Sequence, residues 1–311
     1  MWTWTPASSA PARGRARAAA ALVSVALLGC TAATGAQGAR GFDSSRAWDH
    51  LRAQVAIGPR VAGTPANKAT RDYITKTLAG FGIQVVEQPF EARTPLGTVS
   101  MVNLVATLKG TRPERIALAS HFDTKLFREF RFVGASDGAS STAALLELAR
   151  VLKDRPRTYT IELLFLDGEE AVGEWSATDS TYGSRHYVEA ARRAGTLGSL
   201  KALVLLDMIG DRNLNIRREA NSTRWLTDII WATAAKLGHG DAFRQESTYI
   251  EDDHIPFLQA GVDAVDIIDL DYPAWHTAQD TLEQVSARSL QIVGDVVLAA
   301  LPEIEQHLLK Q

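Results

Sequence analysis

Two adjacent acidic residues follow a short apolar segment in the middle of the chain. The apolar segment, residues 163–166, ends at Asp167-Gly168, and Glu169 and Glu170 come directly after this turn. Four apolar residues in a row favour a strand that is covered on both faces. Two buried acids are costly unless a positive charge lies beside them. One carboxylate of the pair can therefore hold a cation while its neighbour transfers protons, although a solvated loop with surface acids remains the alternative.

Further side chains of metal-ligating types are expected at the ends of strands or in the loops that follow them. Together with one acid of the pair they form a set of nitrogen and oxygen ligands: His121, Asp137, Glu170, Asp207 and His276. In α/β sheets ligands bind beyond the carboxyl ends of the strands, so we expect this set to converge at one edge. Such a set suits zinc or a similar first-row ion. Asp123 is expected to orient the ring of His121.

The elements that position these residues alternate between strands and helices. A first helix is expected to begin near Ser44-Ser45, where a serine can cap it. The remaining expected helices cover residues 65–81, 140–152, 182–193, 222–237 and 286–309, and Pro302 is expected to kink or split the last one. The expected strands cover residues 84–91, 100–109, 116–121, 159–166, 203–207 and 263–268. This order predicts a single α/β domain, with a mixed, mostly parallel twisted sheet and helices on both faces.

The composition is that of a soluble globular chain and gives no sign of nucleic-acid binding. Of the 311 residues, 46% are hydrophobic and 22% are charged, as in ordinary globular domains. The net charge is −3 and no stripe of lysine and arginine is apparent, so a nucleic-acid partner is excluded. A monomer is expected.

The N-terminal segment has the features of an export signal. Three arginines precede a small apolar run, residues 18–29, which is too short to span a bilayer but suits a secretory signal. The run ends at Cys30, the only cysteine, in a motif that resembles a bacterial lipobox. We expect a signal peptide and lipobox over 1–30, a flexible tether over 31–45 and a catalytic domain over 46–311. The protein is then an exported cell-envelope lipoprotein that contacts the membrane only through its lipid anchor, or a periplasmic or secreted protein if the signal is simply cleaved.

Several motifs resemble known families over residues 45–300. The first group resembles the M28 family of zinc hydrolases: Ser120-His-Phe-Asp-Thr-Lys125, Val133-Gly-Ala-Ser-Asp-Gly138, Asp167-Gly-Glu-Glu-Ala171, Leu205-Leu-Asp-Met-Ile-Gly210 and Trp275-His-Thr277. A second group resembles, more narrowly, the animal-type glutaminyl-peptide cyclotransferases: Glu174-Trp-Ser176, Asp179-Ser-Thr-Tyr-Gly-Ser-Arg-His186 and Asp252-Asp-His-Ile-Pro-Phe257. The resemblance implies a zinc aminopeptidase-like fold and a peptide or protein N-terminus as substrate.

The resemblance also implies a metal centre. One catalytic zinc would be held by Asp137, Glu170 and His276. In M28 aminopeptidases the residues that match His121 and Asp207 bind a second zinc, and the metal would activate a water for peptide hydrolysis. The ligand types alone do not decide between one zinc and two. A cyclase with one zinc and an aminopeptidase with two therefore stand as alternatives, and a non-catalytic binding lipoprotein is a third.

In the cyclase reading, the resemblance assigns further roles. Glu169 would transfer the proton, and Asp207 and Asp252 would position it and raise its pKa through like charge. Three aromatic residues match positions that line the cyclase pocket, or else simply pack in the core: Trp175, Tyr272 and Trp275. Two residues depart from the animal pattern, since Glu251 stands in place of a glutamine and Asp266 in place of a histidine.

Overall fold

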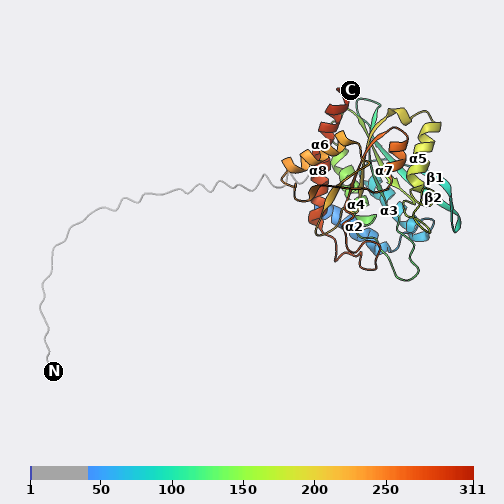
Figure 1. The fold of residues 1–311 in the computed structure, drawn as a ribbon, viewed down its shortest axis with the longest axis horizontal. Helices are drawn as coiled ribbons and strands as arrows, with labels where there is room; N and C mark the ends of the chain where they lie inside the picture. The colour runs from blue at the N-terminus through green and yellow to red at the C-terminus, as the bar shows by residue number, and fades with distance from the viewer. Residues whose placement is uncertain (2–40) are drawn as a thin grey trace, which may run out of the picture.

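The computed structural model describes residue 1 and residues 41–311, which form the coloured ribbon in Figure 1. The expected signal peptide, lipobox and Cys30, and most of the expected tether, lie outside the described residues. The folded domain begins slightly earlier than expected. Phe42 is buried in the core and Asp43 caps the first helix, α2 (Ser44–Ile57), by accepting a hydrogen bond from the Ser45 amide. None of the described helices combines the length and apolar character that spanning a bilayer requires.

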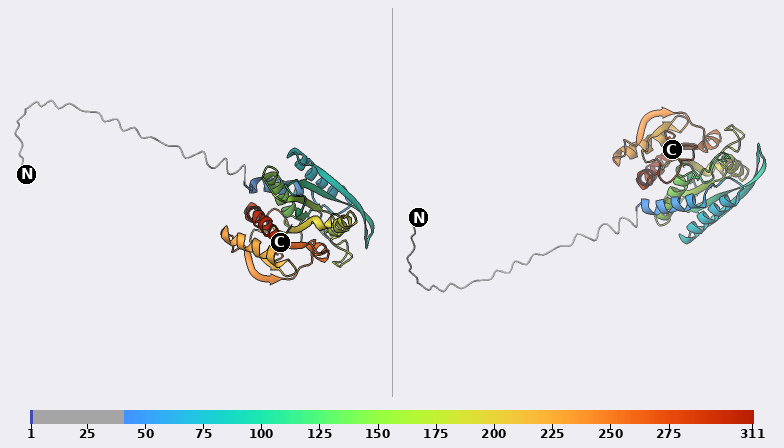
Figure 2. Two further views of the ribbon diagram at one scale, coloured as in Figure 1. Left: turned by 90° about the horizontal axis from the view of Figure 1, so that it is seen from above. Right: turned by 90° about the horizontal axis from the view of Figure 1, so that it is seen from below.

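A six-stranded sheet forms the centre of the domain, as the alternating pattern predicts. Its strands stand in the order β1 (Val85–Thr94), β2 (Gly97–Leu108), β4 (Thr160–Leu166), β3 (Arg115–His121), β5 (Leu200–Asp207) and β8 (Asp263–Ile268). From β4 to β8 all neighbours pair in parallel, whereas β1 and β2 form an antiparallel hairpin that closes one edge (Figure 2). The parallel part brings the carboxyl ends of four strands to the same edge of the sheet.

Alternate residues of the strands face two separate hydrophobic cores. In β3, Ile116 and Leu118 belong to the larger core, and Ala117 and Ala119 to the smaller one. The larger core is covered by α2, α4 (Ala139–Leu152), α6 (Arg224–Lys236) and α8 (Ala287–Leu308), with α3 (Pro65–Gly80) packed beside α2 and α4. The smaller core is covered by α5 (Tyr182–Arg193), α7 (His254–Gln259) and the short 3-10 helix Leu197–Ser199. Helices therefore cover both faces of the sheet, as expected.

Three local features differ from the sequence expectations. A small parallel sheet pairs β6 (Ile216–Glu219) with β7 (Phe243–Thr248), and its largely polar strands give no apolar alternation to detect. The short helix α7 was also not expected. Of the two outcomes expected for Pro302, a kink or a split, the split is wrong, because α8 is continuous. The ring of Pro302 lies on the exposed side of the helix.

Candidate metal centre and pocket

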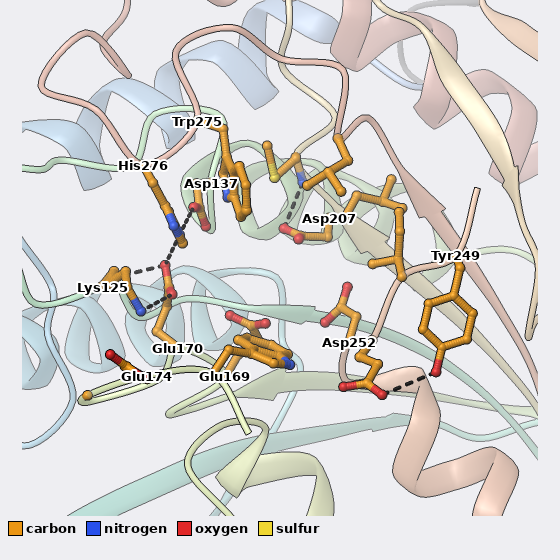
Figure 3. A pocket seen from close by; sticks show the side chains of 17 residues that line it. Lys125, Asp137, Glu169, Glu170, Glu174, Asp207, Tyr249, Asp252, Trp275 and His276 are labelled. Carbon is orange, nitrogen blue, oxygen red and sulfur yellow. Dashed lines mark hydrogen bonds and ion pairs between the residues drawn. The ribbon is translucent and has the colours of Figure 1, made fainter. Parts of the chain in front are cut away.

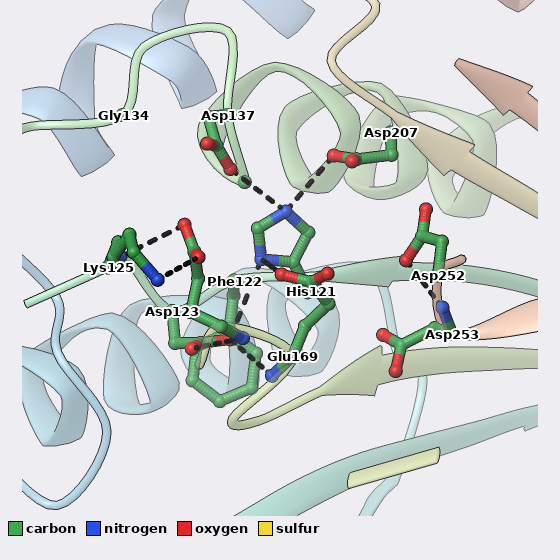
Figure 4. Close-up of polar contacts among 12 residues, drawn as sticks. His121, Phe122, Asp123, Lys125, Gly134, Asp137, Glu169, Asp207, Asp252 and Asp253 are labelled. Atoms are coloured by element: carbon green, nitrogen blue, oxygen red, sulfur yellow. Dashed lines mark hydrogen bonds and ion pairs between the residues drawn. The ribbon is translucent and has the colours of Figure 1, made fainter. Parts of the chain in front are cut away.

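The carboxyl edge of the sheet carries the acidic and imidazole side chains that the sequence singles out. His121 is the last residue of β3 and Asp207 the last of β5, on neighbouring parallel strands. Glu169 and Glu170 follow β4 after a turn in which Gly168 has a φ of 69°. All four side chains are buried. Figure 4 shows His121, Asp137, Asp207 and Glu169 gathered at this edge.

Asp137, Glu170 and His276 form one compact group of potential ligands. One ligand atom from each lies within 4.8 Å of the other two. His276 Nε2 is 3.4 Å from Asp137 Oδ2 and 3.3 Å from Glu170 Oε1 (Figure 3). Ligand atoms bonded to a common zinc ion at about 2 Å are separated by similar distances. One imidazole and two carboxylates facing each other in a buried site therefore fit a divalent cation.

The ring of His276 is held in place by aromatic neighbours and an unusual backbone conformation. Trp275 stacks on the ring with a centroid distance of 4.3 Å, and Phe127 and Phe132 meet it edge-on at 5.6 and 5.9 Å. The φ of His276 is 54°, in the left-handed region that side chains other than glycine rarely adopt. Such strained residues persist where the surrounding structure fixes them. The loop thus holds the imidazole toward Asp137 and Glu170.

A second group of potential ligands shares Asp137 with the first. His121 Nε2 is 3.0 Å from Asp207 Oδ1 and 3.3 Å from Asp137 Oδ1. Asp137 therefore points one oxygen toward His121 and the other toward His276. Gly138 makes this approach possible, since a Cβ there would lie 3.0 Å from the His121 ring and 2.7 Å from a backbone oxygen. The geometry offers donors for one cation or for two that share a carboxylate.

Asp123 links the His121 strand to the acidic pair. As the sequence suggests, it approaches His121, with 3.5 Å between Oδ1 and Nδ1. Its carboxylate also accepts hydrogen bonds from the amides of Glu169 and Glu170, at 3.1 and 3.3 Å. Asp123 therefore fixes the turn that carries both acids, a role that the sequence alone does not indicate.

Glu169 stands beside both groups of ligands without belonging to either. Its Oε2 lies 3.7 Å from His121 Nδ1, and its side chain lines the pocket. Burial raises the pKa of Glu169 well above its usual value, and the charge of Asp252 raises it further. Of the two acids expected to raise the pKa of Glu169, Asp252 has this effect through its charge. Asp207 instead directs its carboxylate to His121, which is a correction to the expected pairing.

A pocket of about 570 Å³ opens over these residues, and aromatic and acidic side chains line it (Figure 3). Trp175 and Trp275 line it, which is the first of the two alternatives for these residues, and they are 39% and 42% exposed. The prediction for Tyr272 is wrong. This residue is buried in an apolar cluster whose members Met208, Ile250 and Ile268 line the pocket, but it does not line the pocket itself, and its hydroxyl donates to Asp280 at 2.7 Å. Tyr249, which also lines the pocket, was missed because it follows the unexpected strand β7.

Two further buried residues hold the loop that carries Asp137, and sequence reasoning missed both. Asp280 accepts hydrogen bonds from the amides of Ser136 and Asp137, at 2.8 and 3.2 Å. The guanidinium of Arg60 is fully buried and donates to main-chain carbonyl oxygens of Gly58, Phe122, Val133, Gly134 and Asp137. Burial lowers the pKa of Arg60 to about 10. A lone arginine in a turn-rich loop gives no sequence signal for such a role.

Comparison with known proteins relates the chain to one group of enzymes. The model of peptidase family M28 matches residues 103–301. A glutaminyl-peptide cyclotransferase of Bothrops jararaca is 32% identical over 293 residues, which covers 81% of this chain and 79% of that protein. Among solved structures, the glutaminyl cyclase of an Acidobacteriales bacterium is 40% identical with a TM-score of 0.83, covering 86% of this chain and 96% of that one. A leucine aminopeptidase precursor from Bacteroides thetaiotaomicron is 28% identical with a TM-score of 0.79, covering 85% and 98%.

Proposed function

Because the chain belongs to peptidase family M28 and, within it, to the glutaminyl-peptide cyclotransferases, we propose that it converts N-terminal glutamine of peptides or proteins to pyroglutamate and releases ammonia. The observation that carries the proposal is the separation of roles at the strand edge. Asp137, Glu170 and His276 face a common point, while Glu169 lies outside that group and lines the pocket. A substrate bound in the pocket would therefore meet both a cation site and a free carboxylate.

The cation in this proposal is zinc, held by Asp137, Glu170 and His276. When bound, it would act as a Lewis acid that polarises the γ-carboxamide carbonyl of the glutamine. The buried mixture of one imidazole and two carboxylates supports zinc over calcium or magnesium, which favour oxygen ligands alone.

Glu169 is the proton-transfer group of the proposed reaction. Its carboxylate takes a proton from the α-amino group, and the amine nitrogen forms a bond to the δ-carbon of the glutamine side chain. As the bond from that carbon to the amide nitrogen breaks, Glu169 returns the proton and ammonia leaves. Burial, the first cause, raises the pKa of Glu169 above that of a free carboxyl, which favours the protonated form that must return the proton.

The other residues of the pocket position the substrate and Glu169. The attack is intramolecular, so the enzyme mainly supplies orientation and charge stabilisation. Asp252 lies near Glu169 and adds a negative charge that disfavours its ionised form. Trp175 and Trp275 provide apolar surface for the glutamine methylene groups at the mouth of the pocket.

An aminopeptidase is the second candidate, favoured by the group formed by His121, Asp137 and Asp207. That group offers the donors of a second metal, as the two-zinc reading of the family requires. A hydrolase would use Glu169 to activate a water that attacks the first peptide bond.

The proposal also includes export of the protein, a lipid anchor on Cys30 and a monomeric state.

A two-peptide assay separates the candidates. The purified protein with zinc is incubated with a glutamine-initiated peptide and with the same peptide initiated by alanine. The cyclase proposal predicts that the first peptide releases ammonia and that its mass falls by the mass of one ammonia. The second peptide should not change. Release of free alanine, with no ammonia from the glutamine peptide, would establish the peptidase instead.

A further inference from the structure

A third group of buried ligand-type side chains extends from Asp252 away from the pocket, and Asp252 is its only member with a part in the proposed reaction. Asp252, His254 and Asp266 each offer one ligand atom within 4.8 Å of the other two. They come from the start of α7 and from β8, and His254 and Asp266 have no exposed surface. The group shares no residue with the two groups built around Asp137.

The orientation of His254 is that of a metal-binding histidine. Its Nε2 lies 3.0 Å from Glu219 Oε2, a hydrogen bond that fixes the ring. Its Nδ1 faces Asp266 Oδ2 at 3.6 Å and has no hydrogen-bond partner among the described residues. Histidines that bind metals usually donate their second ring nitrogen to a carboxylate in this way. Glu219 is itself anchored, because it accepts from the amides of Asn221 and Ser222.

Unlike Glu219, the carboxyl groups of Asp252 and Asp266 have few donors around them. Among the described residues, no amide, hydroxyl or cationic side chain donates to either oxygen of Asp266 or to Oδ2 of Asp252, and these two carboxyl groups are partners only of each other when one is protonated. With Glu219, three buried carboxyl groups lie beside the imidazole of His254. Buried charges of one sign must be neutralised by protons or by a cation.

We propose that Asp252, His254 and Asp266 bind a divalent first-row transition ion, such as zinc, at a site separate from the proposed catalytic centre. One imidazole nitrogen and two carboxylate oxygens are a donor set of the type that these ions prefer. An ion at this point would bind the free Nδ1 of His254 and balance the negative charge of the surrounding carboxylates. Asp252 also lines the pocket, so the ion can enter from solvent along its side chain. An ion held there would offset part of the negative charge that Asp252 places beside Glu169, whichever reaction the pocket catalyses.

The test is the number of zinc ions bound per chain. Protein stripped with a chelator is dialysed against zinc alone, and its metal content is measured by mass spectrometry for the wild type, Asp266→Asn and His254→Gln. Asp269→Asn is the matched control, because Asp269 is an equally buried acid directly after β8, and its carboxylate accepts main-chain amides instead. We expect the first two variants to bind one zinc fewer than the wild type, and the control to bind the same number.

Equal zinc content in the wild type, Asp266→Asn and His254→Gln would overturn the proposal and show that the acids hold protons instead. Circular dichroism identifies any variant that fails to fold. The zinc content of a variant that does fold then tests the proposal. Anomalous diffraction from a zinc-soaked wild-type crystal needs no variant. A peak between Asp252, His254 and Asp266 is expected, and its absence beside an occupied site at His276 would refute the inference.

Discussion

Replacing Arg60 by methionine should loosen both the fold and the metal site, because Arg60 joins the two loops that carry His121 and Asp137. Its Nε donates to Phe122 O at 3.0 Å, directly after His121. Its terminal nitrogens donate to Val133 O at 2.6 Å and Gly134 O at 3.0 Å. Among the described residues, no carboxylate lies within ion-pair distance of the guanidinium, so these carbonyl oxygens are its main partners.

The magnitude follows from these three shortest bonds. Hydrogen bonds from a charged donor contribute about 1.5–3 kcal/mol each. Removing them costs less than their sum, because the variant no longer buries a charge. We therefore expect Arg60→Met to lower the free energy of unfolding by about 3–5 kcal/mol. The matched control is Arg52→Met on the exposed face of α2, which should change it by less than about 0.5 kcal/mol.

The assay measures stability and metal binding separately. Urea unfolding in the presence of a chelator gives the stability of the metal-free protein, and zinc titration of the folded protein gives Kd. Disturbing the residues that hold metal ligands typically weakens binding by about 10–100-fold, and we expect a change of that size for Arg60→Met. A variant as stable as Arg52→Met, with unchanged zinc affinity, would refute the role assigned to Arg60.

Two further predictions concern pH and substrate choice. Burial lowers the pKa of His50 from 6.5 to about 4. Because the unfolded chain takes up the proton first, the contribution of neutral His50 to stability is complete above pH 6.5 and is lost as the pH falls through 4. His50→Gln should reduce this loss by about 1–3 kcal/mol in urea unfolding at pH values of about 7 and 4.5, and an unchanged difference would contradict the burial argument. Glu174 and Glu251 are exposed at the pocket and Lys125 is its only lysine or arginine, so a Gln-Lys peptide should have a kcat/KM about 3- to 10-fold above that of a Gln-Glu peptide. The preference should shrink in roughly 0.5 M salt and in E174Q/E251Q, and its persistence in both would contradict the charge argument.

The parts of this protein that could be predicted from sequence are those controlled by local pattern. Apolar runs that end at His121, Leu166 and Asp207 predict buried strands, and parallel pairing brings strand ends together whatever the details of the loops. The glycines around Asp137 likewise mark a tight turn before a helix, and Gly138 has a φ of 79°. Position along the chain was therefore enough to place the candidate ligands at one edge.

The remaining features depend on contacts between distant segments. Tyr272 carries an aromatic ring next to the pocket loop, yet its hydroxyl is satisfied by Asp280 and the ring turns inward. Arg60 is buried only because five carbonyl oxygens from three segments converge on it. The strands β6 and β7 are polar and pair with each other at the side of the domain. No pattern within a short window of sequence carries this information.

The central claim is that Glu169 stays outside the metal-ligand group and transfers the proton. The most direct measurement is zinc content and ammonia release in the same sample of Glu169→Gln, which keeps the size of the side chain but removes its ability to accept a proton. The account predicts wild-type zinc content with ammonia release lowered by about 10²- to 10⁴-fold. Activity within roughly threefold of the wild type, or loss of the zinc, would contradict it.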